Sequence, residues 1–263
     1  MNNTFKYMYY INLDRRIDRW DECMERINTT CLVNFPYTRF SAFNGKDYDN
    51  ELKRFLEKDE YRDYINKIIE IMKETKIKKP NFAFKKGEFG CSISHLCVLI
   101  DILNNPDFKD DDYICIFEED FYYAGSPENF NKSFLSLNET DLNKLDIDFL
   151  YIGGRFKPNF YTQGECYEQT DNINIFQRIK RISRHENDRG AFSYVIRKKI
   201  CKKLIDIIVD RFIKTTEHYT KLEPIDCIYQ VLVDEIKIFD YFPHIFYSPA
   251  NYKSDIQNND YQR

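Results

Sequence analysis

Three consecutive acidic residues, Glu118, Glu119 and Asp120, are the side chains of this sequence best suited to chemistry. They follow an apolar run, residues 113–117, which has the composition of a buried strand in a parallel sheet. Such sheets bind ligands outside the carboxyl ends of their strands, and crowded carboxylates repel one another unless a cation lies among them. Glu118 and Asp120 would point to the same side of an extended chain. The sequence therefore predicts a divalent metal site able to neutralise a diphosphate, with a solvated acidic turn as the alternative.

Polar residues also follow two other apolar runs of the chain. Arg15 and Arg19 come after the first run, and arginine suits phosphate because its guanidinium donates two parallel hydrogen bonds. Surface ion pairs with neighbouring acids are the alternative role for both arginines. Asn44 closes the second run, where its amide could contact a base or a ribose, although it is equally suited to forming a turn.

Three further side chains could complete such a site. His244 could add an imidazole ligand to an acidic metal site. Asp226 begins a predicted helix, where a carboxylate complements the helix dipole and can also act as a general base. Asp188 lies in an irregular segment and is the second candidate for the base. His95 follows Ser94 directly, and adjacent helix residues point apart, so these two residues form no hydrolase dyad.

The elements that must position these residues alternate between strands and helices. We expect strands at 7–13, 39–43, 113–117, 148–152 and 191–197, and short strands within 237–247. We expect helices at 17–27, 87–104, 198–212 and 224–236, one or two surface helices within 49–78, and an irregular segment at 156–188. Asp14 is the expected N-cap of the first helix. The alternation predicts an α/β fold with a mainly parallel sheet and right-handed crossovers.

The composition limits the classes of function. The chain has 263 residues, enough to bury a sizeable core, and its formal net charge of -4 argues against a general nucleic-acid binder. The sequence has no apolar run of membrane-spanning length and no apolar signal core at its start, so we expect no transmembrane segment and a cytoplasmic protein. The eight cysteines form no C-x-x-C pair, which argues against a zinc ribbon and favours reduced thiols.

Short blocks of this chain resemble the motifs of glycosyltransferase family 25, which includes bacterial lipooligosaccharide galactosyltransferases and collagen hydroxylysine galactosyltransferases. Residues 10–19 resemble its opening motif and read Tyr-Ile-Asn-Leu-Asp-Arg-Arg-Ile-Asp-Arg. Residues 39–45 resemble its second block, with Asn44 where the family usually has Asp. Residues 87–95 resemble its Gly-Glu-x-Gly-Cys-x-x-Ser-His block.

The resemblance continues in the same order along the rest of the chain. Residues 117–120 resemble the family's Glu-Asp-Asp metal motif, with Glu119 in place of the middle Asp. Residues 190–196 resemble a Gly-x-x-Ala-Tyr-x-Ile block, and residues 224–226 and 254–257 resemble a Pro-x-Asp block and a C-terminal block. Each block alone has low specificity, but the ordered set covers nearly the whole chain and is specific.

The resemblance implies a GT-A type fold, in which helices flank a Rossmann-like mixed, mainly parallel sheet. It also implies a UDP-sugar donor, dependence on Mn2+ (or Mg2+), and inversion at the anomeric carbon. We expect one domain over residues 1–263, with a nucleotide-sugar-binding half at 1–125 and an acceptor-side half at 126–263. The acceptor would be the hydroxyl of a glycan or of a hydroxylysine in a collagen-like protein.

The residues and the resemblance together assign expected roles. Glu118, Asp120 and His244 would hold the metal ion. Asp226, or as second choice Asp188, would take the acceptor proton as the sugar transfers. The donor would be bound by residues of the first four blocks: Asn12, Leu13, Arg15, Arg19, Ala42, Asn44, Glu88, Ser94 and Glu119.

Two other classes of protein fit the same residues. A non-catalytic nucleotide-sugar-binding module would bind the donor without transferring or hydrolysing it. A metal-dependent phosphohydrolase using the same acids would release phosphate from simple esters. The release of UDP from a panel of UDP-sugars distinguishes these classes.

Overall fold

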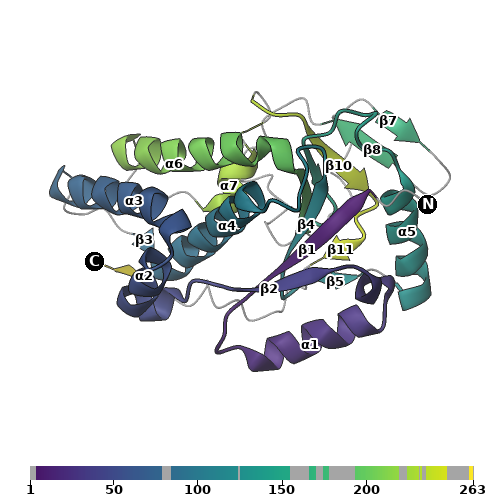
Figure 1. Ribbon diagram of the computed structural model, residues 1–263, viewed down its shortest axis with the longest axis horizontal. Coiled ribbons are helices and arrows are strands. Elements are labelled where there is room, and N and C mark those ends of the chain that lie inside the picture. The colour runs from purple at the N-terminus through teal and green to yellow at the C-terminus, as the bar shows by residue number, and fades with distance from the viewer. Residues whose placement is uncertain are drawn as a thin grey trace. The chain divides into compact units, whose positions relative to one another are not determined.

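The computed structural model describes residues 4–78, 84–123, 125–154, 166–169, 174–177, 193–218, 224–230, 232, 235–247 and 261–262. The chain forms two compact units, each assembled from separate segments. Unit 1 comprises Met1–Phe40, Pro106–Ile200 and Tyr229–Tyr252, and unit 2 comprises Ser41–Asn105, Cys201–Ile228 and Lys253–Arg263. Unit 1 carries the large sheet, and unit 2 is mainly helical (Figure 1). The single domain with a donor half and an acceptor half stays a prediction.

Within the described residues, unit 1 is built on an eight-stranded sheet with the strand order β2-β1-β4-β9-β6-β10-β8-β7. In that order the strands are Tyr37–Ser41, Phe5–Asn12, Tyr113–Glu118, Ser193–Arg197, Phe149–Tyr151, Ile238–Phe242, Asn174–Gln177 and Cys166–Gln169. β1 pairs parallel with β4, and β6 pairs parallel with β10. β9 is antiparallel to both β4 and β6, so β1, β4, β6 and β10 share one direction and β9 is reversed among them. The predicted α/β fold with a mixed, mainly parallel sheet is confirmed.

Helices cover a face of this sheet through one hydrophobic core. The helices of unit 1 are α1 (Ile17–Asn28) and α5 (Pro127–Glu139), with short 3-10 turns η1 (Cys31–Asn34) and η4 (Lys198–Ile200). Alternate strand positions supply the core, with Met8 and Tyr10 from β1 and Cys115 and Phe117 from β4. Side chains of α1 and α5 pack into the same core. A two-stranded antiparallel pair, β5 (Tyr122–Tyr123) and β11 (Phe246–Tyr247), completes the described part of the unit.

Two predictions about the helices and strands of unit 1 are wrong. Asp14 does not cap α1, because the Arg16 N–H donates to the Leu13 carbonyl at 2.8 Å, and this turn places Arg16 at the N-cap. The segment predicted to be irregular, 156–188, contains the strands β7 and β8. These strands form because β8 pairs with β10 and β7 pairs with β8. Neither strand has an apolar run in its own sequence from which it could be predicted.

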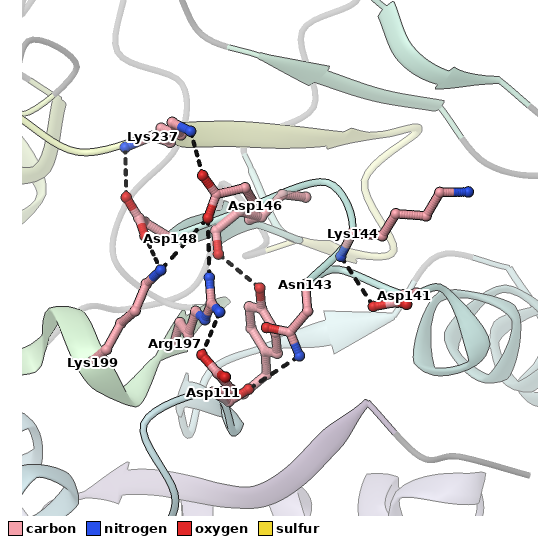
Figure 2. A network of polar contacts seen from close by, with 11 residues as sticks. Asp111, Asp141, Asn143, Lys144, Asp146, Asp148, Arg197, Lys199 and Lys237 are labelled. Atoms are coloured by element: carbon pink, nitrogen blue, oxygen red, sulfur yellow. Dashed lines mark hydrogen bonds and ion pairs between the residues drawn. The ribbon is translucent and has the colours of Figure 1, made fainter.

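A network of charged side chains lies where β4, β6 and β10 begin and β9 ends (Figure 2). Arg197 of β9 is buried and donates to Asp111 and, at 3.2 Å, to Asp146. Asp146 also accepts from Lys237, and one of its oxygens lies 3.5 Å from Lys199 Nζ. The hydrogen bond from Lys237 lowers the pKa of the Asp146 carboxyl. The network therefore links the end of β9 to the starts of β4, β6 and β10. It lies at the edge of the sheet opposite to the edge where β4, β6 and β10 end.

Unit 2 is a cluster of helices. Its elements are η2 (Gly45–Asp47), α2 (Tyr48–Leu56), α3 (Asp59–Lys78), α4 (Lys86–Asn104), α6 (Cys201–His218), most of α7 (Ile225–Gln230), and the strand pair β3 (Phe84–Lys85) and β12 (Tyr261–Gln262). α3 and α4 both pack against α6. Ile65, Ile68 and Met72 of α3 are buried, so the segment predicted to be a surface helix contributes one face to this core. Within the described part of the chain, no helix combines the length and the hydropathy of a membrane-spanning segment.

Candidate active site

The strands that share one direction end at one edge of the sheet in unit 1. β1 ends at Asn12, β4 ends at Glu118, and β10 ends at Phe242, two residues before His244. Sheets of this kind bind ligands outside the carboxyl ends of their parallel strands. The three residues predicted to bind metal therefore all lie at this edge: Glu118 is the last residue of β4, Asp120 comes two residues later, and His244 comes two residues after β10.

The acidic residues form a turn and do not prolong the strand. β4 ends at Glu118, and the Phe121 N–H donates to the Glu118 carbonyl at 3.3 Å, which closes a turn over Glu119 and Asp120. The prediction that Glu118 and Asp120 share one side of an extended chain is therefore wrong, because the alternation of side chains ends with the strand. In this turn the three acids differ in their exposure to solvent: Glu118 and Asp120 are half-buried, whereas Glu119 is buried.

Glu119 is buried against α1. Arg19 Nη1 donates to Glu119 Oε1 at 3.0 Å, and these residues are only 5% and 8% exposed. Burial raises the pKa of the Glu119 carboxyl, and the hydrogen bond from Arg19 opposes that rise. Arg26 Nη2 donates to the Glu119 carbonyl at 2.7 Å. Two of the predicted donor-binding residues, Arg19 and Glu119, thus form a buried ion pair with each other.

Backbone contacts place His244 beside Gly154, which follows β6. A Cβ atom on Gly154 would lie 2.2 Å from Cε1 and Nδ1 of His244, so the imidazole occupies space that only glycine leaves open. The Gly154 N–H donates to the Phe246 carbonyl at 3.2 Å. Phe246 in turn pairs with Tyr123 across the β5–β11 ladder. The segment that follows His244 therefore runs beside the segment that follows Asp120.

The donor groups at this edge are of the kinds that bind divalent metal ions, but the ligand atoms of Glu118, Asp120 and His244 do not all lie within 4.8 Å of one another. Asp120 Oδ1 and His244 Nε2 are both buried atoms, while Glu118 and Asp120 keep part of their surface exposed. Carboxylate oxygens suit Mg2+ and Mn2+, and an added imidazole nitrogen is acceptable to Mn2+. The chemistry of the side chains is thus compatible with the metal role assigned from the sequence.

Asn12 is held by Arg39, a residue to which the sequence assigned no role. Arg39 Nε and Nη2 donate to Asn12 Oδ1 at 3.0 and 2.6 Å, and Asn12 Nδ2 donates to the Arg16 carbonyl at 3.4 Å. The Arg39 guanidinium lies over the Trp20 ring, 4.9 Å from its centroid. The buried amide of Asn12 therefore fixes the loop between β1 and α1, and Arg15 is exposed on that loop.

Unit 2 contains residues 41–45 of the second sequence block and the whole third block, and joins them by direct contacts. Ser94 Oγ accepts from the Phe43 N–H at 2.8 Å and donates to the Gly90 carbonyl at 2.7 Å. A Cβ atom on Gly90 would lie 2.5 Å from the Phe43 carbonyl oxygen, and one on Gly45 would lie 2.1 Å from the Lys86 carbonyl oxygen. Another stretch of backbone therefore approaches each of these glycines too closely to leave room for a side chain.

Other predicted donor residues of unit 2 also have contacts within that unit. The Asn44 side chain caps η2, which is the turn-forming role considered for it. The Ala42 carbonyl accepts from Arg54 at 3.0 Å, and Glu88 lies 3.2 Å from Lys85 in an ion pair at the start of α4. These contacts fix the segment between β2 and α2 and the first turn of α4.

The two candidate bases lie in different parts of the sequence. Asp226 occupies the first turn of α7 and is half-buried. Asp188 lies outside the described residues, as does the C-terminal block at 254–257. In unit 1, Tyr229 is buried and its hydroxyl lies 3.2 Å from the hydroxyl of Tyr194 of β9.

Arg26, Arg39 and Gly154 support the site residues of unit 1 and were not found from the sequence. Arg26 lies seven residues after Arg19 on one helix, a spacing that returns to the same face and could have indicated a shared partner. Gly154 comes two residues after the predicted strand 148–152 and gave no signal of its later partner. Arg39 gave no local signal, because its partner Asn12 is 27 residues away.

Comparisons with known proteins identify the family of this chain. The profile described as Glycosyltransferase family 25 (LPS biosynthesis protein) matches residues 5–227, and no curated protein gives a significant match. Among solved structures, the apo form of the glycosyltransferase GlyE from Streptococcus pneumoniae TIGR4 is similar to this chain, with 11% identity and a TM-score of 0.31. The similarity covers 90% of this chain and 54% of the GlyE chain, so this chain spans about half of that length. Because the profile matches most of its residues, the chain belongs to glycosyltransferase family 25.

Proposed function

We propose that this chain is a metal-dependent, inverting glycosyltransferase that moves galactose or glucose from a UDP-sugar to a hydroxyl acceptor. The family supports sugar transfer as the class of activity. One observation supports the finer proposal: Glu118, Asp120 and His244 lie at the ends of strands, or within two residues of them, along the same edge of the sheet. That edge is where an α/β sheet binds a nucleotide.

The residues divide the chemistry among them. Glu118, Asp120 and His244 would hold Mn2+ or Mg2+, which when bound would neutralise the diphosphate of the departing UDP. Arg15, exposed on the loop after β1, would add positive charge for the phosphates. Asp226 would accept the proton of the acceptor hydroxyl, with Asp188 as the second candidate.

A single displacement needs only that one base. In that displacement the acceptor oxygen forms the new bond to the anomeric carbon as the bond to UDP breaks, so the configuration inverts. The closely spaced nucleophile and acid of a retaining hydrolase are not required. The LPS biosynthesis named in the family description supports a glycan acceptor, and a hydroxylysine of a collagen-like protein is the other acceptor to test.

Released UDP is the measurement that tests the proposal. The protein would be incubated with a panel of UDP-sugars, with a glycan or a collagen-like peptide as acceptor, and with or without a chelator. We expect acceptor-dependent UDP release from UDP-galactose or UDP-glucose, lost with chelator and restored by Mn2+. Donor binding without UDP release would indicate a non-catalytic module, and phosphate release from simple esters would indicate a phosphohydrolase.

Gly154→Ala is expected to weaken Mn2+ binding about tenfold to a hundredfold, the range seen when the support of a metal ligand is disturbed. The reason is steric, because the new Cβ would overlap the His244 ring and displace it. Calorimetry of Mn2+ binding to the protein alone measures the effect. In a His244→Ala background the same substitution should cause no further loss, and a full additional loss there would show that Gly154 acts on something other than His244.

A further inference from the structure

Glu119 is fixed by contacts to each of its polar groups. Its backbone N–H donates to the Ile11 carbonyl of β1 at 3.1 Å, and its carbonyl accepts from Arg26 Nη2 at 2.7 Å. Its carboxylate accepts from Arg19 Nη1 at 3.0 Å. The centre of the acidic turn is therefore joined to the sheet on one side and to α1 on the other.

α1 contributes both of these arginines from one face. Arg19 and Arg26 are seven residues apart, which is about two helical turns, and both are buried. The Arg26 guanidinium also lies over the Tyr122 ring, 4.3 Å from its centroid, and 5.4 Å from that of Phe121. Buried arginines are rare unless paired, so two on one face of a short helix indicate a specific partner. That partner is the turn that carries the three acids.

We propose that Arg19 and Arg26 are positioning residues for the acidic turn, and that Glu119 is the anchor through which they hold it. Glu118 and Asp120 are then the two carboxylates that the turn presents to a divalent cation. This inference rests on the metal role in the proposed function, and it replaces the donor-binding role expected of Arg19 and Glu119.

The electrostatics of the turn explain why an anchor is useful. Three adjacent carboxylates repel one another, and the repulsion would favour turn conformations that spread them apart. The ion pair between Arg19 and Glu119 withdraws the middle charge from that cluster. Two carboxylates remain, and their joint charge matches that of a divalent ion.

Matched substitutions separate positioning from stability. Arg19→Met combined with Glu119→Met replaces a buried ion pair by apolar side chains, a change that commonly leaves the folded state intact. We expect this double variant to unfold near the wild-type midpoint and to bind Mn2+ about tenfold to a hundredfold more weakly. Unfolding can be followed by the fluorescence of Trp20, the only tryptophan of the chain, which lies on α1 itself. Arg62→Met combined with Asp59→Met removes an exposed ion pair of α3 and should leave Mn2+ affinity unchanged.

A second comparison uses substitutions that keep the shape of the side chain. Glu119→Gln keeps an oxygen that accepts from Arg19, so the turn should stay in place. We expect its loss of Mn2+ affinity to be no more than about tenfold, the smallest loss usual for residues that support a metal ligand. Glu118→Gln removes a ligand carboxylate and should lose more affinity than Glu119→Gln. The reverse order would overturn the inference, and so would wild-type affinity in the Arg19 and Glu119 double variant. If the wild type itself binds no Mn2+, the metal role in the proposed function fails, which is a different result.

Discussion

Replacing Asp120 with alanine is expected to remove both Mn2+-dependent UDP-sugar binding and sugar transfer, while the protein stays folded. Asp120 lies in the turn after β4, directly after Glu119, and its Oδ1 atom is buried. Without a cation, the acids of this turn and the donor diphosphate would repel each other at close range. Removal of one carboxylate from the turn relieves repulsion in the metal-free protein, so we expect no loss of folding stability.

Calorimetry with UDP and Mn2+ and an assay of released UDP measure the two losses. A chelator should reproduce both in the wild type. Glu74→Ala is a suitable control, because it removes one exposed carboxylate from α3 and should change neither quantity. Full UDP-sugar turnover in chelator, together with wild-type activity of Asp120→Ala, would falsify the metal role.

Replacing Asp226 with asparagine is expected to slow sugar transfer by roughly 10²–10⁴-fold, the usual contribution of a general base. Asparagine has the shape of aspartate and is also tolerated at the start of a helix, so α7 should still form. Donor binding should survive, because a base acts on the acceptor hydroxyl and not on UDP. Single-turnover transfer and UDP affinity, measured on the same preparation, separate the two effects.

The contrast between two aspartates sharpens this test. Asp63→Asn makes the same change at an exposed position of α3 and should leave transfer unchanged. Asp188→Asn tests the second candidate base. Near-wild-type turnover of Asp226→Asn with a large loss in Asp188→Asn would move the role to Asp188.

Local pattern was sufficient to predict the elements whose cores are continuous in the sequence. The apolar run at 113–117 predicted a buried strand, and β4 is Tyr113–Glu118. Apolar residues at three- and four-residue spacing predicted the helix at 87–104, and α4 is Lys86–Asn104. The mixed, mainly parallel α/β sheet expected of a GT-A type fold is likewise confirmed.

The remaining features depend on contacts between residues far apart in the sequence. In sequence Glu118, Glu119 and Asp120 are three similar acids. Contacts from Arg19 and Arg26, which are 100 and 93 residues away, distinguish Glu119. Ser94 was expected to contact the donor, yet its hydroxyl binds the Phe43 N–H across 51 residues. No window of sequence contains both members of such pairs, so their roles could not be predicted from local pattern.

The reversed strand β9 has a consequence for how the chain is made. β4 and β6 are complete by Tyr151, but the strand that lies between them begins only at Ser193. During translation, β4 and β6 therefore leave the ribosome before β9, the strand that pairs with both, has been synthesised. Uncovered edges of apolar strands are sites of aggregation, which nascent chains avoid by remaining unfolded or bound to chaperones. We therefore expect fragments that stop before β9 to retain these open edges and to aggregate more readily than the full chain.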